Sequence, residues 1–405
     1  MLIFAFFFRG SILLVSQYDQ LNHTNKDSEN DKCEIVNAFL NVVLVEPFGI
    51  FAIARRKSRI HTIMKAVIFN QHGGPDVLQY TDVPDPQIKA NEVLVEVKAC
   101  ALNHLDIWTR AGLRGVEIPL PRILGNDVAG VVREVGELVN WIEPGAEVLV
   151  QPGVSCGHCL ACLEGRDNMC PEYDIIGYRR NGGYAELLSV PGVNVVRKPA
   201  NLSWEEAAAL PLVTLTAWHM LVGRANVQPG ETVLVHAAGS GVGSMGIQVA
   251  KLRGARVIAT AGSDEKLRKA KDLGADEVVN YSLADWPKEI KKLTNRAGVD
   301  VVFEHTGAET WNGSISVLKN NGRLVTCGAT SGFDARTDLR QVFYRHLTIL
   351  GSFMGSKGEL LEALEFVKRG QIRPILDRRL PLSEARQAHD LIEDRAQFGK
   401  IVLIP

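Results

Sequence analysis

The strongest constraint on this chain lies at residues 232–246, where the short apolar run TVLV passes through a cluster of small residues into a helical apolar pattern. A strand, a glycine turn and a helix form a unit that binds nucleotide phosphates, because glycines let the backbone approach the ligand closely. The helix N-terminus adds free N–H groups and a partial positive charge. Gly241, Gly243 and Gly246 fit the G-x-G-x-x-G pattern, but the surrounding sequence must decide what this pattern means.

Around this stretch, residues 201–349 alternate between helices and strands. Apolar, β-branched runs predict strands at 232–235, 255–260, 277–280, 299–304 and 322–327. Helical periodicity predicts helices at 204–212, 216–222, 265–273 and 286–294. This alternation predicts an α/β fold with a doubly wound parallel sheet, so we assign residues 196–349 to a Rossmann dinucleotide-binding domain.

The end of the second strand bears on which dinucleotide binds. An Asp or Glu there usually holds the ribose 2′-hydroxyl of NAD(H), whereas this chain has Ala261. Without that carboxylate a 2′-phosphate is not repelled, and Ser263 and Lys266 can bind it, so we predict NADP(H). Asp264 and Glu265 favour NAD(H) instead, unless they serve as the cap and first turn of the next helix.

Residues 64–195 have a different pattern, with short strands separated by frequent turns. Strand-like runs lie at 64–69, 92–99, 128–135 and 147–150. We therefore predict a small, mostly β domain. The last segment, 350–405, is too short to form a domain of its own, and we expect it to return and complete this first domain.

Four of the seven cysteines crowd into one loop of this domain: Cys156, Cys159, Cys162 and Cys170. Four thiolates at this spacing can close a tetrahedron around Zn²⁺, and a four-cysteine site without an open position is structural. We predict one structural Zn²⁺ per chain, with reduced surface cysteines and an iron–sulfur centre as alternatives. Metal binding in place of disulfides indicates a reducing compartment, and we expect the cytoplasm.

Two other stretches of this domain collect polar residues beside glycine. One holds Asn103, His104 and Asp106, and the other holds Asn126 and Asp127. Such side chains act as hydrogen-bond donors, proton relays or ligands, or they cap the junctions between strands and helices. The residues alone leave both roles open.

Charge limits the partners of the chain. A net charge of −1 over 405 residues gives no electrostatic basis for binding nucleic acid or an acidic membrane surface, so we expect neither partner.

Residues 1–63 differ from the rest, because apolar runs flank a polar patch at 17–32. We interpret them as an appended or mis-started segment outside the fold, with targeting or membrane contact and an accessory element as alternatives.

A series of short motifs follows the chain from residue 65 onward. These are KAVI at 65–68, GNDVAG at 125–130, the four-cysteine loop, GGYAE at 182–186 and the glycine turn. With these motifs, residues 64–405 resemble the medium-chain dehydrogenase/reductase superfamily, which includes zinc-containing alcohol dehydrogenases and quinone oxidoreductases. The resemblance implies a GroES-like catalytic domain split around the Rossmann domain and an active site for a small-molecule substrate between them. It also implies a homodimer or homotetramer.

Departures from the family pattern refine this expectation. Alcohol dehydrogenases of the family hold a catalytic zinc through a Cys, a Gly-His-Glu motif and a further Cys or acid, and the matching positions here look like Asn103, Asn126 and Leu212. Asn is a poor zinc ligand and Leu is none, so we expect no catalytic zinc. The pattern ALNHLD at 101–106 and the turn AAGSGVG at 237–243 look more like the quinone-oxidoreductase and enoyl-reductase branch, which works without catalytic metal and prefers NADPH.

Chemistry and resemblance together give an expected site. Asn103 and Asn126 would stabilise a developing oxyanion, Asp106 and Asp127 would orient them, and solvent or Tyr178 would supply a proton. In the family's register Ala238, Ser240 and Gly243 form the phosphate turn. The expected cofactor-binding residues are His104, Ala238, Ser240, Gly241, Val242, Gly243, Ser263, Lys266, Tyr281, Thr306, Gly328 and Lys400.

These residues predict an NADPH-dependent reductase of α,β-unsaturated carbonyls, quinones or enoyl thioesters. The alternative is an alcohol dehydrogenase that interconverts alcohol and aldehyde or ketone, either metal-free or with zinc held by His104 and Asp127. A nucleotide-binding or structural protein without activity is a third hypothesis.

Overall fold

The computed structural model describes residues 2–8, 11–17, 42–46, 49–50, 62–283 and 285–405. The chain divides into two compact units, Met1–Thr62 and Ile63–Pro405. In the first unit the described strands β1 (Leu2–Phe8), β2 (Ser11–Gln17), β3 (Val42–Glu46) and β4 (Gly49–Ile50) pair antiparallel in that order. Apart from residue 17, the polar patch noted at 17–32 lies outside the described residues.

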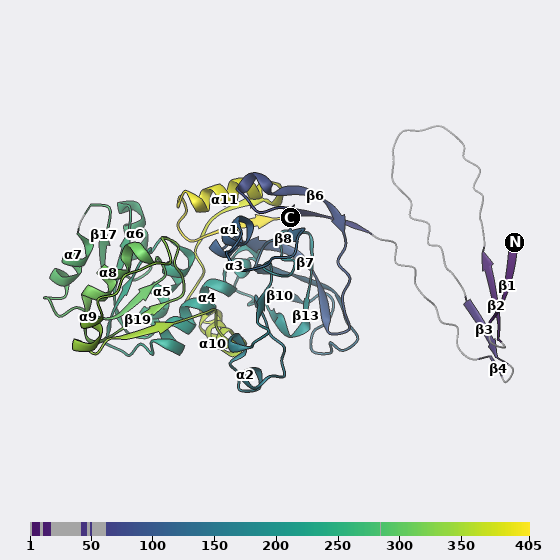
Figure 1. Cartoon of the computed structure of the whole chain (residues 1–405), viewed down its shortest axis with the longest axis horizontal. Helices are drawn as coiled ribbons and strands as arrows, with labels where there is room; N and C mark the ends of the chain where they lie inside the picture. Colours follow the sequence, from purple (N-terminus) through teal and green to yellow (C-terminus); the bar gives the residue numbers. More distant parts are fainter. Residues whose placement is uncertain (1, 9–10, 18–41, 47–48, 51–61, 284) are drawn as a thin grey trace. The chain divides into compact units, whose positions relative to one another are not determined.

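A parallel sheet with flanking helices forms one half of the second unit, the Rossmann half (Figure 1). Its strands are β15 (Thr232–Val235), β16 (Arg256–Ala261), β17 (Glu277–Asn280), β18 (Val299–Glu304), β19 (Leu318–Thr326) and β20 (Thr348–Gly351). They follow the order β17-β16-β15-β18-β19-β20, and each neighbouring pair is parallel. The helices are α5 (Gly241–Leu252), α6 (Asp264–Asp272), α7 (Trp286–Leu293), α8 (Ala308–Val317) and α9 (Leu339–Tyr344). The predicted doubly wound α/β fold is confirmed.

Three elements of this half were not predicted from the sequence: β20, α8 and α9. β20 has only four residues, and most of its side chains are not buried, so no apolar run marks it. α8 contains Gly313 among poor helix formers. A Cβ at Gly313 would lie 2.3 Å from Trp286 Cζ2, so the glycine allows α7 and α8 to pack closely.

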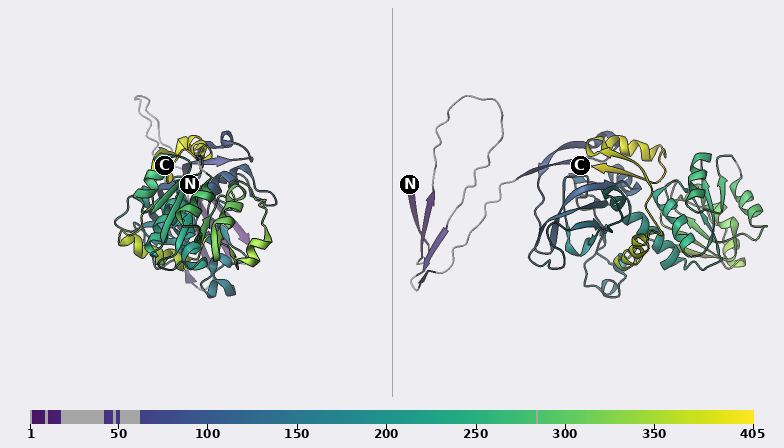
Figure 2. Two further views of the ribbon diagram at one scale, coloured as in Figure 1. Left: turned by 90° about the vertical axis from the view of Figure 1, so that its left-hand side faces the viewer. Right: turned by 180° about the vertical axis from the view of Figure 1, so that it is seen from behind.

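The remaining strands form the β-rich half. Its larger sheet has the order β14 (Val195–Arg197), β10 (Glu147–Val150), β9 (Asp127–Val135), β7 (Glu92–Ala101), β22 (Lys400–Ile404) and β21 (Leu376–Pro381), with β13 (Leu187–Pro191) also paired to β7. A smaller sheet contains β6 (Gln79–Pro84), β5 (Ile63–Phe69) and β8 (Arg122–Ile123). The C-terminal strand β22 is antiparallel to β7. Figure 2 shows the C-terminal helix α11 (Ala385–Glu393) beside the early strands.

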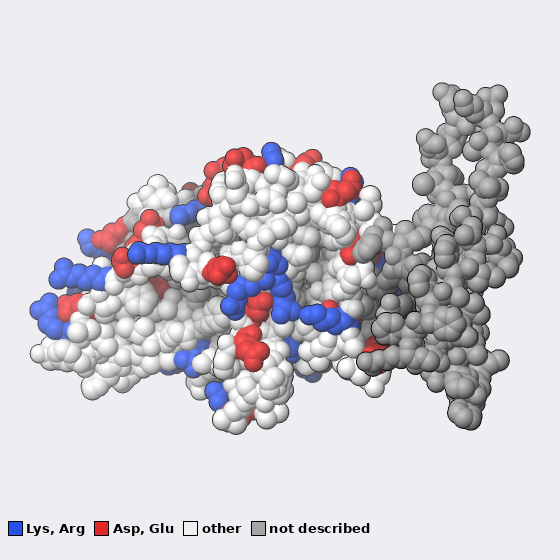
Figure 3. Space-filling view, turned by 45° about the vertical axis from the view of Figure 1, so that its right-hand side comes forward, with Lys and Arg blue, Asp and Glu red and all other residues white. Residues whose placement is uncertain are grey.

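Helices α3 (Trp204–Ala209), α4 (Pro211–Trp218) and α10 (Lys357–Lys368) lie where the halves meet (Figure 1). The helix predicted at 204–212 is interrupted at Leu210, and the one predicted at 216–222 is divided between α4 and a π-helix, His219–Arg224. One apolar core joins Ala129 of β9 to Trp218 of α4 and Phe303 of β18, so the two halves are packed as one body. On the face shown in Figure 3, acidic and basic side chains lie beside one another without a patch of one sign.

Candidate active site

The glycine turn joins β15 to α5 and places the N-terminus of this helix at a cavity. Ser240 is the N-cap of α5, and its Oγ accepts a hydrogen bond from Gly243 N at 2.8 Å. A Cβ at Gly243 would lie 2.3 Å from Ala237 O, so the turn requires glycine there. Gly241 N and Val242 N belong to the first turn and have no acceptor within the helix, which makes them donors for an anionic ligand.

The cavity has a volume of about 440 Å³ and is lined by both halves. The expected site residues that line it are Asn103, His104, Ser240, Gly241, Val242, Lys266, Tyr281, Thr306, Gly328 and Lys400. Those that lie behind its walls are Ala238, Gly243, Ser263, Asp106, Asn126 and Asp127. Ser263 caps α6, because its Oγ accepts from Lys266 N at 3.4 Å.

Asn103, Asp127 and Lys400 form a polar cluster at the cavity wall. Lys400 Nζ donates to Asn103 Oδ1 at 2.5 Å and to Asp127 Oδ2 at 3.0 Å. Asn103 Nδ2 donates to Asp127 Oδ2 at 2.9 Å, and Asp127 Oδ1 accepts from Leu212 N at 2.8 Å. Lys400 was predicted from sequence to bind the cofactor, and the structure places its ammonium among the residues predicted to be catalytic.

Asp106 and Asn126 support this cluster from behind. Asp106 Oδ2 accepts from Asn103 N at 2.7 Å, and its Oδ1 accepts from Gly125 N at 2.9 Å. Asp106 therefore caps α1 (His104–Ala111) and fixes Asn103 at the same time. Burial raises the pKa of Asp106 to about 7. Asn126 Nδ2 donates to Ile176 O at 2.8 Å.

His104 faces the cavity from the first turn of α1. Burial lowers the pKa of its imidazole to about 4, and electrostatic interaction with His305, Arg395 and Lys400 acts in the same direction. The ring is therefore neutral at neutral pH and offers one N–H donor to a ligand.

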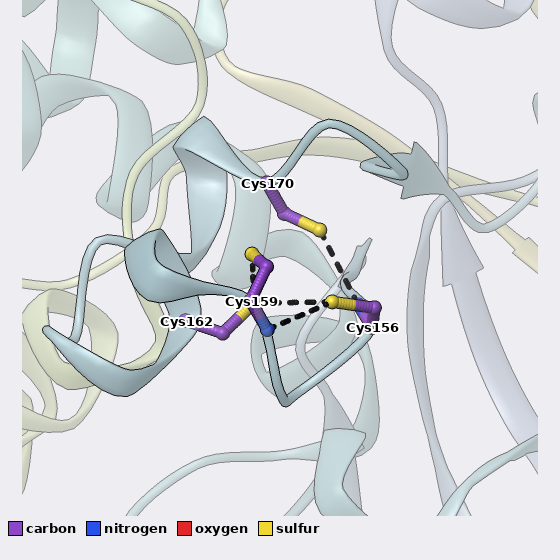
Figure 4. Close-up of side chains that lie close together, drawn as sticks. All are labelled: Cys156, Cys159, Cys162 and Cys170. Atoms are coloured by element: carbon purple, nitrogen blue, oxygen red, sulfur yellow. Dashed lines mark hydrogen bonds between the residues drawn. The ribbon is translucent and has the colours of Figure 1, made fainter.

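The four cysteines come together in a lobe around α2 (Leu160–Leu163) (Figure 4). Their sulfur atoms all lie within 4.8 Å of one another, and Cys159 Sγ is 3.5 Å from Cys162 Sγ. Backbone N–H groups of His158 and Cys159 lower the pKa of Cys156 to about 6, which favours the thiolate. Four thiolate donors fit a structural Zn²⁺.

This lobe also forms part of the cavity wall. Cys170 and Tyr173 pack against Ile175, Leu212 and Met354, and these last three residues line the cavity. The short strands β11 (Gly153–Val154) and β12 (Asp174–Ile175) join the lobe to the β-rich half. A metal that orders the lobe therefore also orders one side of the cavity.

Comparison with known proteins agrees with this architecture. A family model described as alcohol dehydrogenase GroES-like domain matches residues 89–200, and one described as zinc-binding dehydrogenase matches residues 241–369. An NAD-dependent alcohol dehydrogenase of Sulfurisphaera tokodaii is 32% identical over 351 residues, which cover 84% of this chain and 100% of the relative. The chain belongs to the medium-chain dehydrogenase/reductase superfamily. It is thus an NAD(P)-dependent oxidoreductase.

Two further members of the superfamily show its range. A crotonyl-CoA reductase of Streptomyces avermitilis is 32% identical over 363 residues, which cover 79% of this chain and 80% of the relative. A crystal structure titled NAD-dependent alcohol dehydrogenase has a TM-score of 0.82 and 51% identity, and the match covers 84% of this chain and 100% of that chain. Both alcohol oxidation and enoyl reduction thus occur among the relatives.

Some residues of this oxidoreductase site were not predicted. Arg395, two residues after the end of α11, lines the cavity, and its backbone oxygen accepts from Lys266 Nζ at 2.5 Å. Glu304, fully buried at the end of β18, accepts from Thr306 N at 2.7 Å and Ser314 Oγ at 2.7 Å, and so fixes the loop that carries Thr306. An acid at the end of the mostly apolar strand β18 was the available signal for Glu304, whereas nothing in the sequence singled out Arg395.

None of the helices in the described ranges has the length and apolar character required to cross a bilayer.

Proposed function

We propose that this enzyme is an NADPH-dependent reductase that transfers hydride to an α,β-unsaturated carbonyl, a quinone or an enoyl thioester without catalytic zinc. The position of Lys400 carries the proposal. Its ammonium is bonded to Asn103 Oδ1 and Asp127 Oδ2, at a place that resembles the catalytic zinc site of the family's alcohol dehydrogenases. A cation held there repels Zn²⁺ and occupies the oxygens that a metal would need.

The dinucleotide would lie along the glycine turn, and when bound it would supply the hydride. The N-terminus of α5 offers Gly241 N and Val242 N to the pyrophosphate. Ala261 leaves space and no negative charge at the end of β16, and Lys266 offers an ammonium to a 2′-phosphate. These two features support NADPH.

The two acidic residues that would favour NADH are engaged in other interactions. Asp264 Oδ1 accepts from Asn280 Nδ2 at 2.9 Å, and Glu265 pairs with Lys269 at 2.9 Å. Both lie in the first turn of α6, where acidic side chains stabilise the helix dipole. Because the named dehydrogenase relatives use NAD, we would measure dissociation constants of NADPH and NADH directly. Tighter binding of NADH would reject this part of the proposal.

The substrate side of the cavity is mainly apolar. The side chains that give it this character are Leu105, Trp108, Ile175, Leu212, Phe353 and Met354. Such a lining fits a substrate with an apolar body. Within the same wall the polar cluster supplies the place for one reacting oxygen.

The test is a screen of NADPH oxidation by the full chain with quinones, enones, enoyl-CoA thioesters and aldehydes, together with zinc analysis. The proposal expects turnover of at least one conjugated class and a single Zn²⁺ per chain. Two Zn²⁺ per chain with alcohol oxidation would reject it. Tight NADPH binding without turnover of any substrate would instead favour a protein without catalytic activity.

Alcohol dehydrogenation is the second candidate, because the 51% identical solved structure carries that title. In the absence of a metal ligand set at the polar cluster, Lys400 would have to bind the alkoxide oxygen. Oxidation of simple alcohols with NADP⁺ or NAD⁺, measured beside the enone screen, separates the two candidates.

We also propose that the enzyme is a homodimer or homotetramer. β20 forms an edge of the parallel sheet and pairs with β19 on one side. Ile349 on this strand and Phe343 and Tyr344 on α9 are exposed, and an apolar sheet edge is a ready surface for a second copy. Light scattering coupled to size-exclusion chromatography measures the mass, and a monomer would contradict this proposal.

A further inference from the structure

A reductase of conjugated carbonyls needs a group that binds the reacting oxygen, and the two amides expected for this role are already engaged. Asn103 Nδ2 donates to Asp127 Oδ2 at 2.9 Å and faces Asn126 Oδ1 at 3.5 Å. Asn126 is fully buried, does not line the cavity and donates to Ile176 O. Neither amide therefore presents a hydrogen-bond donor to a ligand.

The ammonium of Lys400, at the same wall of the cavity, has one N–H group without a partner among the described residues. An ammonium carries three N–H groups, and two of those of Lys400 go to Asn103 Oδ1 and Asp127 Oδ2. These two oxygens are its hydrogen-bond partners among the described residues. The side chain is only 4% exposed and lines the cavity, so the third N–H is available to a molecule inside it.

The hydrogen bonds of Lys400 hold its ammonium group in one position. Asp127 is fully buried and is itself held by Leu212 N and Asn103 Nδ2, and Asn103 is held by Asp106. A donor that is already oriented needs no reorganisation when negative charge develops near it, and a site with little water strengthens the interaction.

We propose that Lys400 is a catalytic residue whose third N–H binds the carbonyl oxygen of an α,β-unsaturated ketone, aldehyde or thioester. This inference rests on the proposed function and deepens it. When hydride adds to the β-carbon, the electron pair of the C=C bond moves towards the carbonyl and the oxygen becomes an enolate. Lys400 binds the enolate oxygen more strongly than the neutral carbonyl, and the α-carbon then takes a proton from water.

Binding of the cofactor pyrophosphate is the competing role for Lys400. The stem of the side chain passes the N-terminus of α5, since a Cβ at Gly241 would lie 2.8 Å from Lys400 Cδ. The ammonium, however, is bonded to two groups of the β-rich half. The two roles predict different losses when the charge is removed.

The test compares Lys400→Met with the wild type as full chains, using two readouts besides turnover. NADPH binding is followed by fluorescence, and para-nitrophenol serves as an enolate mimic whose absorbance reports its ionised form in the cofactor-free protein. We expect the wild type to bind the nitrophenolate at pH values where free nitrophenol is largely neutral. Lys400→Met should lose this signal and lose about 10²–10³-fold in kcat/KM for the enone, with an unchanged Kd for NADPH.

Lys266→Met provides the opposite pattern, because Lys266 lines the cavity but belongs to α6. It should weaken NADPH binding and leave the nitrophenolate signal intact. Circular dichroism shows whether Lys400→Met folds. If it does not fold, Lys400→Arg takes its place. This variant keeps the positive charge and should keep the nitrophenolate signal, and loss of the signal would overturn the inference.

Three other outcomes also test the proposed role of Lys400. Wild-type kcat/KM in Lys400→Met, or no nitrophenolate signal in the wild type, overturns the assignment while the reductase function stands. If Lys400→Met raises the Kd for NADPH and leaves kcat at saturating NADPH unchanged, Lys400 instead binds the phosphates of the cofactor. Failure of the proposed function is seen separately, as a wild type that reduces no conjugated substrate.

Discussion

Lys266 Nζ donates a hydrogen bond to the backbone oxygen of Arg395 at 2.5 Å, which joins α6 of the Rossmann half to the loop before β22. Gly399 N repeats this link farther along the same loop by donating to Gly239 O at 2.8 Å. The segment that ends in Lys400 thus contacts the helix proposed to bind the 2′-phosphate, the glycine turn and the polar cluster. This one segment therefore carries both a contact with α6 and a residue of the polar cluster.

The first prediction concerns cofactor choice. Lys266→Met should raise the Kd for NADPH about tenfold or more, because a charge-assisted hydrogen bond contributes about 1.5–3 kcal/mol, and should leave NADH binding nearly unchanged. Lys269→Met is the matched control, since Lys269 lies on the same helix, pairs with Glu265 and does not line this cavity. Fluorescence titrations with both nucleotides measure the effect. Equal losses for NADPH and NADH would contradict a 2′-phosphate role.

The second prediction is loss of stability in acid. Burial lowers the pKa of His104 and His236 to about 4 and that of His389 to about 3, all from 6.5. As the pH falls from 6.5 towards 4, the unfolded chain binds protons that the folded protein does not, so the folded protein loses stability. Asp106 opposes this change, because its pKa is raised from 3.8 to about 7 and the folded protein then binds the extra proton.

Three histidines outweigh one aspartate over this range. Each fully responding group changes the free energy of unfolding by about 1.4 kcal/mol per pH unit, so a net decrease on acidification is expected. Urea titrations between about pH 7 and pH 5 measure it. His389→Gln should reduce the slope, because it removes one of these buried imidazoles. A free energy of unfolding that rises on acidification would contradict the prediction.

The sequence predicted most of the Rossmann half because its strands are buried on both faces and read as apolar runs. β16 and β18 illustrate this, since nearly all their side chains are buried. β20 was missed because an edge strand of four residues with mostly exposed side chains carries no such signal. α8 was missed because most of its residues, including Gly313, are poor helix formers, so local propensity does not indicate a helix there.

The sequence predicted individual residues of the site but not which of them contact one another. The sequence singled out Asn103, Asp127 and Lys400, but Asn103 and Lys400 lie 297 positions apart, and only pairing of β22 with β7 brings them together. Lys400 was therefore assigned to the cofactor from resemblance. The amide of Asn126 was expected to face a substrate, and its burial follows from contact with Ile176, which no local pattern encodes.

The third prediction tests the glycine turn. Gly243→Ala should weaken NADPH binding strongly and lower the melting temperature, because the added Cβ would lie 2.3 Å from Ala237 O and would displace the turn. Gly358→Ala in α10 is the control, since the nearest atom to its Cβ would be Ser356 Oγ at 3.8 Å. This control should fold normally and is expected to be slightly more stable, as alanine favours helix by about 1 kcal/mol over glycine. Unchanged NADPH binding in Gly243→Ala would show that the turn does not hold the dinucleotide.

The fourth prediction links the cysteine lobe to substrate binding. Cys159→Ser should lose Zn²⁺ and raise KM for the substrate about tenfold, equivalent to about 1.4 kcal/mol, while NADPH binding stays unchanged. The physical reason is that Cys170 and Tyr173 support Ile175 and Met354, which line the cavity, and that the Tyr173 ring packs edge-on against Phe353 at 5.8 Å. Met169→Ala in the same lobe removes a side chain that is 62% exposed and should keep both zinc and KM. Loss of zinc with an unchanged KM would show that the lobe and the cavity are independent, whereas loss of NADPH binding as well would show that the metal stabilises the whole unit.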